Sequence, residues 1–100
     1  MSKITQSARQ EECTIRSPWC NFDRDTTVWC HAPSGLEFGR GANVKSHDAI
    51  GCYGCSQCHD TIDGRAHIHE TTFEQRRSMF LRGFCASFDM LIEKGLVVIP

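Results

Sequence analysis

Seven cysteines in a chain of 100 residues constrain what this sequence can fold into more than any other feature. The count is odd, and the N-terminal segment lacks the apolar stretch of a secretion signal, which indicates a reducing, cytoplasmic setting. In such a setting, clustered cysteines bind metal more often than they form disulfides. A domain of this size has a thin core and often needs an additional staple. We therefore predict a single domain over residues 1–100 that a zinc ion helps to hold together.

The spacing of the cysteines predicts which thiols bind this metal. Two cysteines separated by two residues, as in Cys55 and Cys58, can bind one tetrahedral Zn²⁺ from a tight turn. Cys13 and Cys20 are the expected second half of the site. Cys52 precedes Cys55 at the same spacing, and spacing alone does not choose between Cys52 and Cys58. The remaining cysteines suit small buried apolar positions: Cys30, Cys52 and Cys85.

Side-chain patterns in the first two thirds of the chain predict a mixture of helix and strand, an α+β fold. Residues 1–10 are polar and suit a short helical arm, whereas 26–31 are β-branched and aromatic, as in a strand. The glycine-rich stretch 33–51 is typical of a loop, and long loops in small domains are often functional. A short helix is expected from residue 56 to about residue 63, with Gly64 as its stop.

A longer amphipathic helix is predicted near the C-terminus. Thr71 and Glu74 have the spacing of a capping box, and Gly95 is a typical helix stop. Residues 96–99 suit a short terminal strand. Apolar side chains recur at helical spacing and predict the buried face of the long helix: Phe73, Phe80, Leu81, Phe84, Phe88, Leu91 and Ile92.

The net charge of −1 argues against a protein that binds nucleic acid through a strong, sequence-independent basic field. It does not argue against a nuclease, because a metal ion and a few local arginines can hold a phosphate. No apolar run is long enough to cross a bilayer, so no membrane partner is expected. The polar face of the long helix carries arginines that suit either phosphate contact or a solvated surface: Arg76, Arg77 and Arg82.

A second group of residues has the chemistry of a hard-metal site. His59 directly follows Cys58, and Asp63 lies four residues later, so both side chains project from one face of the predicted helix and can share a metal ion. Upstream, His31 ends the predicted strand, and Asp48 lies in the glycine-rich loop. An imidazole in its neutral form suits a general base near pH 7.

This order of residues resembles the HNH (His-Me finger) nucleases. The resemblance is in particular to the small phage and prophage nucleases of the YbcO kind, which are similar to the phage recombination-enhancement nuclease Ref. It covers nearly the whole chain, and the block CSQCHD is its most specific part. The matching stretches are Glu11-Glu12-Cys13 with Cys20, TTVWCH ending at His31, Lys45-x2-Asp48, CSQCHDTID ending at Asp63, and Lys94-Gly95-Leu96.

The resemblance implies a zinc-stapled ββα-metal domain that acts as a metal-dependent endonuclease. Its substrate would be DNA, single-stranded or coated by a recombinase, in phage recombination or DNA processing. His31 would be the general base, and Asp48, in place of the family's usual Asn, would orient it. His59 and Asp63 would bind a catalytic Mg²⁺ or Mn²⁺. The structural zinc would bind Cys13, Cys20, Cys55 and Cys58.

The resemblance also implies one departure at the position before the general base. Many relatives carry an acidic residue or a second histidine there as a metal ligand, whereas this chain has Cys30. A thiolate is a soft ligand and suits Mg²⁺ poorly, so Zn²⁺ is an alternative catalytic ion.

Two other functions fit the same residues. A zinc-binding module that contacts DNA or a protein without cutting would carry the same four cysteines, and only a second metal site at His31 and His59 distinguishes the two. A redox-sensing protein is a further alternative, since thiols outside the metal site could be reactive. The other histidines are interpreted as packed or surface residues: His47, His67 and His69.

Overall fold

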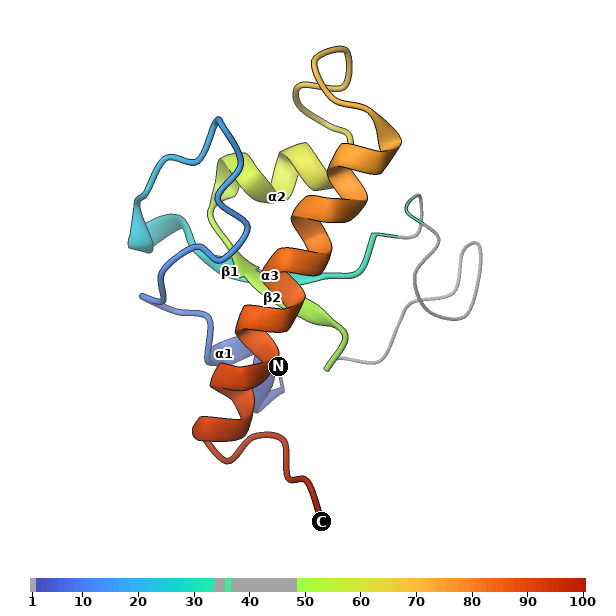
Figure 1. Ribbon diagram of the computed structural model, residues 1–100. Coiled ribbons are helices and arrows are strands. Elements are labelled where there is room, and N and C mark those ends of the chain that lie inside the picture. The colour runs from blue at the N-terminus through green and yellow to red at the C-terminus, as the bar shows by residue number, and fades with distance from the viewer. Residues whose placement is uncertain (1, 34–35, 37–48) are drawn as a thin grey trace.

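A two-stranded antiparallel sheet and a long C-terminal helix form the centre of the molecule (Figure 1). The computed structural model describes residues 2–33, 36 and 49–100. None of the helices in this part of the chain is long and apolar enough to span a membrane. The elements in chain order are α1 (Lys3–Gln6), the 3-10 turn η1 (Arg24–Thr26), β1 (Val28–His31), β2 (Gly51–Gly54), α2 (Ser56–Ile62) and α3 (Phe73–Glu93).

The sheet pairs Cys30 with Cys52 and Trp29 with Tyr53 across the two strands. The predicted strand 26–31 is confirmed as β1 from Val28 on, whereas Thr26 belongs to η1 and Thr27 is the C-cap of that turn. Strand β2 was missed, because its four residues include two glycines and follow a long glycine-rich stretch. The helical arm predicted over residues 1–10 is confirmed in part, because α1 covers only Lys3–Gln6.

Helix α3 approaches β2 most closely at two small residues that the predicted apolar face did not include, Gly83 and Ser87. Gly83 is so close to the strand that a Cβ added there would lie 3.1 Å from the sulfur of Cys52. The hydroxyl of Ser87 accepts a hydrogen bond from the backbone N–H of Tyr53 at 3.0 Å. Of the predicted face, Phe80 and Leu91 are buried, but three members are more than a third exposed: Phe73, Leu81 and Ile92.

Helix ends follow local side-chain chemistry. The capping box of α3 pairs Thr72 with Gln75, one residue after the predicted pair, and Thr72 has the extended backbone of an N-cap. Gly64 and Gly95 follow α2 and α3 with φ of +77° and +73°, as the predicted stops require. The predicted strand at residues 96–99 is wrong: no strand forms there, and its last two residues are mostly exposed.

Two apolar clusters fill the space around the sheet. One contains the cysteines of β1, β2 and the start of α2, together with Ile15, Ile62 and Phe80. The other joins Trp29 and Tyr53 to the N-terminal segment and to the end of α3. The first cluster places the junction of β2 and α2 at the centre of the fold, and this junction carries the residues of the candidate site.

Candidate metal centres

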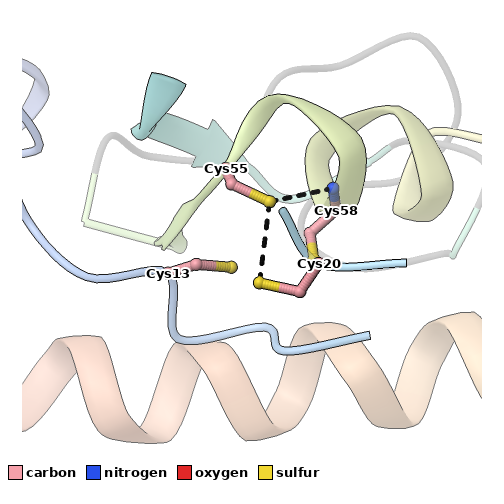
Figure 2. Close-up of side chains that lie close together, drawn as sticks. All are labelled: Cys13, Cys20, Cys55 and Cys58. Carbon is pink, nitrogen blue, oxygen red and sulfur yellow. Dashed lines mark hydrogen bonds between the residues drawn. The ribbon is translucent and has the colours of Figure 1, made fainter. Parts of the chain in front are cut away.

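Four thiols from two distant parts of the chain meet at the start of α2 (Figure 2). The sulfur atoms of Cys13, Cys20, Cys55 and Cys58 all lie within 4.8 Å of one another. Four sulfurs around a tetrahedral ion with bonds of about 2.3 Å would lie roughly 3.8 Å apart. The sulfurs of Cys20 and Cys55 are 3.8 Å apart. The cluster therefore has the size and ligand set to hold a metal ion such as zinc. Spacing predicted three of its members and left Cys58 and Cys52 as alternatives for the fourth.

Local backbone geometry explains why Cys55 and Cys58 converge. Cys55 is the N-cap of α2, and its sulfur accepts a hydrogen bond from the backbone N–H of Cys58 at 3.4 Å. The sulfur of Cys58 in turn faces the backbone N–H of Ser17 at 3.4 Å and the Ser17 hydroxyl at 3.2 Å. Hydrogen-bond donors that face a sulfur favour its thiolate form and help to orient it as a metal ligand. The N-terminal loop is therefore tied to α2 around the cluster.

A hydrogen bond links the thiols of Cys13 and Cys58 within the cluster. A hydrogen bond from Cys58 lowers the pKa of the Cys13 thiol to about 4, and the same bond raises the pKa of Cys58 above its usual value. One sulfur of the cluster is thus stabilised in the thiolate form that metal binding requires.

The structure decides between Cys52 and Cys58 as the fourth ligand. Cys52 is a strand residue that is fully buried opposite Cys30, whereas Cys58 belongs to the cluster. A hydrogen bond with Cys52 and burial raise the pKa of Cys30, so Cys30 is a neutral core thiol. The burial expected for Cys85 is wrong: it lies on the outer side of α3 and is exposed.

A second pair of potential ligands lies one turn along α2. The Nε2 atom of His59 is 3.2 Å from the Oδ2 atom of Asp63, as predicted from their spacing on the helix. Two ligands at neighbouring corners of an octahedron with bonds of about 2.1 Å lie roughly 3 Å apart. The two side chains are 30% and 25% exposed, so solvent can reach them. Arg65 also pairs with Asp63, at 2.8 Å.

The other predicted catalytic residues come from the strand and from the loop after it. His31 is the last residue of β1 and lies opposite Gly51. Its neighbours Cys30 and Ala32 point into the core, whereas His31 is half-buried and keeps access to solvent. Asp48 lies outside the described residues. Of the predicted residues, the structure therefore brings together the four cysteines and, separately, His59 with Asp63.

Sequence reasoning missed an aromatic contact beside the cysteine cluster. The ring of His67 stacks on Trp19 with centroids 4.0 Å apart and planes 8° apart. His67 adopts a positive φ of 58°, a conformation in which histidine is uncommon. Because a sequence pattern does not indicate such a backbone conformation, it did not indicate the contact that depends on it. The stack fastens the turn after α2 to the loop that carries Cys20.

The three arginines of α3 differ from one another. Arg82 donates to the backbone carbonyls of Ile15 and Arg16 and therefore fixes the loop beside Cys13. Arg77 donates to the carbonyl of Leu36 at 3.1 Å. Arg76 donates to Thr71. These three arginines therefore do not form a merely solvated face, because each one donates hydrogen bonds to another part of the chain.

Residues 2–95 match the family model described as "Putative nuclease YbcO". The chain belongs to this family. Two YbcO relatives, from Escherichia coli strain K12 and from Enterobacteria phage 82, are each 30% identical over 99 residues, which covers 97% of this chain and 98% of the relative. A solved structure described as "a putative bacteriophage protein" from Escherichia coli K-12 matches with a TM-score of 0.72 and 27% identity. That match covers 91% of this chain and 98% of the other.

Proposed function

We propose that the chain is a metal-dependent endonuclease of the HNH type that hydrolyses phosphodiester bonds of DNA, in phage recombination or DNA processing. The YbcO family name supports a nuclease function in general. The observation that carries the specific proposal is the pairing of His59 with Asp63 on a helix that directly follows a two-stranded antiparallel sheet. The first strand of that sheet ends in His31. This order, with one histidine at the end of the first strand and another near the start of the helix, resembles the ββα-metal core of HNH nucleases.

In the proposed reaction, His31 takes a proton from a water molecule as the water oxygen attacks the phosphorus. The bond from phosphorus to the 3′ oxygen breaks, and this oxygen takes a proton from solvent. His59 and Asp63 would hold a divalent ion, Mg²⁺ or Mn²⁺, which supplies positive charge where negative charge develops on the phosphate. Asp48 would orient His31.

The four cysteines would hold a zinc ion with a structural role. All four ligand positions of a tetrahedral ion are then occupied by sulfur, which leaves none for substrate, as in structural rather than catalytic zinc sites. The proposed protein thus separates two kinds of metal chemistry: soft thiolates for stability, and an imidazole with a carboxylate for catalysis. Cys30 lies in the core beside Cys52 and takes no part in the proposed catalytic site.

Replacing His59 with alanine should remove the catalytic ion without removing the zinc. A metal ion supplies several kcal/mol of transition-state stabilisation, so we expect nicking of supercoiled plasmid at a fixed Mn²⁺ concentration to fall about 100-fold or more. The wild-type protein should nick only when Mg²⁺ or Mn²⁺ is added. The measurement is the single-turnover nicking rate across a range of Mn²⁺ concentrations.

His69→Ala is the matched control, because His69 is exposed on the turn between α2 and α3. Both variants must hold the same amount of zinc as the wild type. Equal nicking by the wild type and His59→Ala would refute the assignment of His59. Absence of nicking by the zinc-loaded wild type on both plasmid and single-stranded DNA would favour a zinc-binding module that contacts DNA or a protein without cutting.

A further inference from the structure

Arg65 lies directly beside the two proposed ligands of the catalytic ion, although it is not a ligand itself. Its Nη2 atom is 2.8 Å from the Oδ2 atom of Asp63. The Nε2 atom of His59 is 3.2 Å from the same oxygen. One carboxylate oxygen therefore faces both the second ligand and a guanidinium group. A divalent ion that binds the Asp63 carboxylate meets a positive charge that already contacts it.

The backbone at the end of α2 fixes the place of Arg65. Gly64 has a φ of +77° and turns the chain back over the helix. The N–H of Gly64 donates to the carbonyl of Thr61 at 3.2 Å. The N–H of Arg65 donates to the carbonyl of Asp60 at 2.9 Å. These two bonds form a Schellman motif, so the residue after the glycine lies over the last turn of the helix, which carries Asp60 and Asp63.

Asp60 offers Arg65 a second partner. The Nη2 atom that contacts Asp63 is also 3.1 Å from the Oδ1 atom of Asp60. An apolar contact frequently joins these two positions of a Schellman motif, and an ion pair takes its place here. The side chain of Arg65 is 58% exposed, and ion pairs this exposed are weak. Arg65 can therefore give up Asp63 at little cost in free energy and remain paired with Asp60.

The position of Asp63 makes a neighbouring cation favourable. Asp63 is the C-cap of α2, and the C-terminal end of a helix carries a partial negative charge that disfavours a carboxylate. Arg65 supplies positive charge at this point, and a divalent ion would supply more. The guanidinium and the ion would repel each other across one carboxylate, because like charges a few ångströms apart interact strongly. The two cations are therefore alternatives for Asp63.

We propose that Arg65 competes with the divalent ion for Asp63 and so keeps the affinity of the His59–Asp63 pair for Mg²⁺ or Mn²⁺ low. When an ion binds, Arg65 leaves Asp63 and stays paired with Asp60. The inference rests on the proposed function, because it takes His59 and Asp63 as the ligands of the catalytic ion. Occupancy of the site then follows the concentration of free divalent ion, and Arg65 regulates the nuclease without touching its substrate.

The test is Mn²⁺ binding to zinc-loaded protein without DNA, followed by loss of the electron paramagnetic resonance signal of free Mn²⁺ at fixed pH. Arg65→Met removes the competing charge and should lower the Mn²⁺ dissociation constant about five- to tenfold. This gain should shrink as salt is raised, because salt screens exposed charges. His59→Ala, which removes a ligand, should abolish binding in both backgrounds.

Arg24→Met is the matched control. Arg24 is 57% exposed and paired with Glu12, so its loss changes the net charge equally at a carboxylate that is not a proposed ligand. It should leave the Mn²⁺ dissociation constant nearly unchanged. Arg65→Lys keeps the charge and should bind Mn²⁺ like the wild type. Zinc content and unfolding temperature of each variant show whether a change in affinity arises from damage to the fold.

A double-mutant cycle tests the exchange of Arg65 from Asp63 to Asp60. Asp60→Asn should weaken Mn²⁺ binding, because Arg65 then has only Asp63 as a partner. The effect should be much smaller when residue 65 is already methionine, since residues that act through each other are not additive. Equal effects of Asp60→Asn in the two backgrounds would mean that Asp60 acts only through its own charge and would overturn the exchange.

An unchanged Mn²⁺ dissociation constant in Arg65→Met would overturn the competition. Weaker binding in this variant would do the same, because an arginine that only orients Asp63 as a ligand gives the opposite sign. Failure of the nuclease proposal is distinguishable from these results. Tighter Mn²⁺ binding in Arg65→Met without any DNA cleavage would retain the competition and reject the nuclease, whereas His59-dependent cleavage with unchanged affinity would do the reverse. Absence of Mn²⁺ binding by both proteins would overturn both.

Discussion

Replacing Cys58 with serine should abolish metal binding at the four-cysteine cluster and unfold the domain. Serine supplies no thiolate, and its hydroxyl would occupy a fully buried position among the three other sulfurs. Structural zinc contributes about 10–16 kcal/mol of apparent binding free energy in small zinc domains. Most domains are stable by only about 5–15 kcal/mol in total. Loss of one ligand is therefore expected to abolish cooperative folding rather than to lower the unfolding temperature slightly.

Metal content of the purified protein and thermal unfolding by circular dichroism measure this effect. Cys85→Ser should hold one metal per chain and unfold like the wild type, because Cys85 is exposed and outside the cluster. Cys52→Ser is the more stringent control: it changes a buried core thiol, so it should lose stability and still hold one metal per chain. If Cys58→Ser retained a full equivalent of metal and a wild-type unfolding curve, the four-cysteine site would be wrong.

Replacing His31 with alanine should lower the rate of DNA cleavage by about 10²–10⁴-fold, the usual contribution of a general base. Folding and zinc content should change little, because His31 is only half-buried at the end of β1 and takes no part in the cysteine cluster. The loss should persist at saturating Mn²⁺. By contrast, the loss in His59→Ala should depend on the Mn²⁺ concentration if His59 is a ligand.

Single-turnover nicking of plasmid at equal bound zinc separates the two roles. His69→Ala again serves as the control, with no expected change in rate. Equal cleavage by the wild type and His31→Ala would reject His31 as the base and would also raise the suspicion that a contaminating nuclease produces the signal.

The proximity of Cys55 to Cys58 and of His59 to Asp63 could be predicted from sequence because both signals are local. Cys55 and Cys58 occupy the N-cap and the third helical position of α2, so three residues of spacing fix both the helix start and the convergence of two sulfurs. His59 and Asp63 are one helical turn apart, and the pairing follows directly. The helix stops at Gly64 and Gly95 could also be predicted from a local signal, because the residue after a helix often adopts a positive φ and glycine does so most easily.

The contacts that depend on close packing could not be predicted in this way. Helix α3 carries apolar side chains around much of its surface. The side that packs on β2 is decided by Gly83 and Ser87, and a search for apolar residues at helical spacing gives no weight to either residue. The same packing leaves Cys85 in solvent. Strand β2 gave no β-branched signal, so the choice of Cys58 over Cys52 as a ligand became clear only with the strand in place.

The most direct test of the proposed function is whether His31 and His59 share a metal site that is separate from the zinc. Mn²⁺ is added to zinc-loaded protein, and the imidazole NMR signals, assigned with single histidine variants, are followed as the paramagnetic ion broadens those nearby. We expect the signals of His31 and His59 to broaden first, before those of His67 and His69, and the effect to be lost in Asp63→Asn. Broadening that spares His31 and His59, or that reaches all histidines equally, would contradict a catalytic metal at this site.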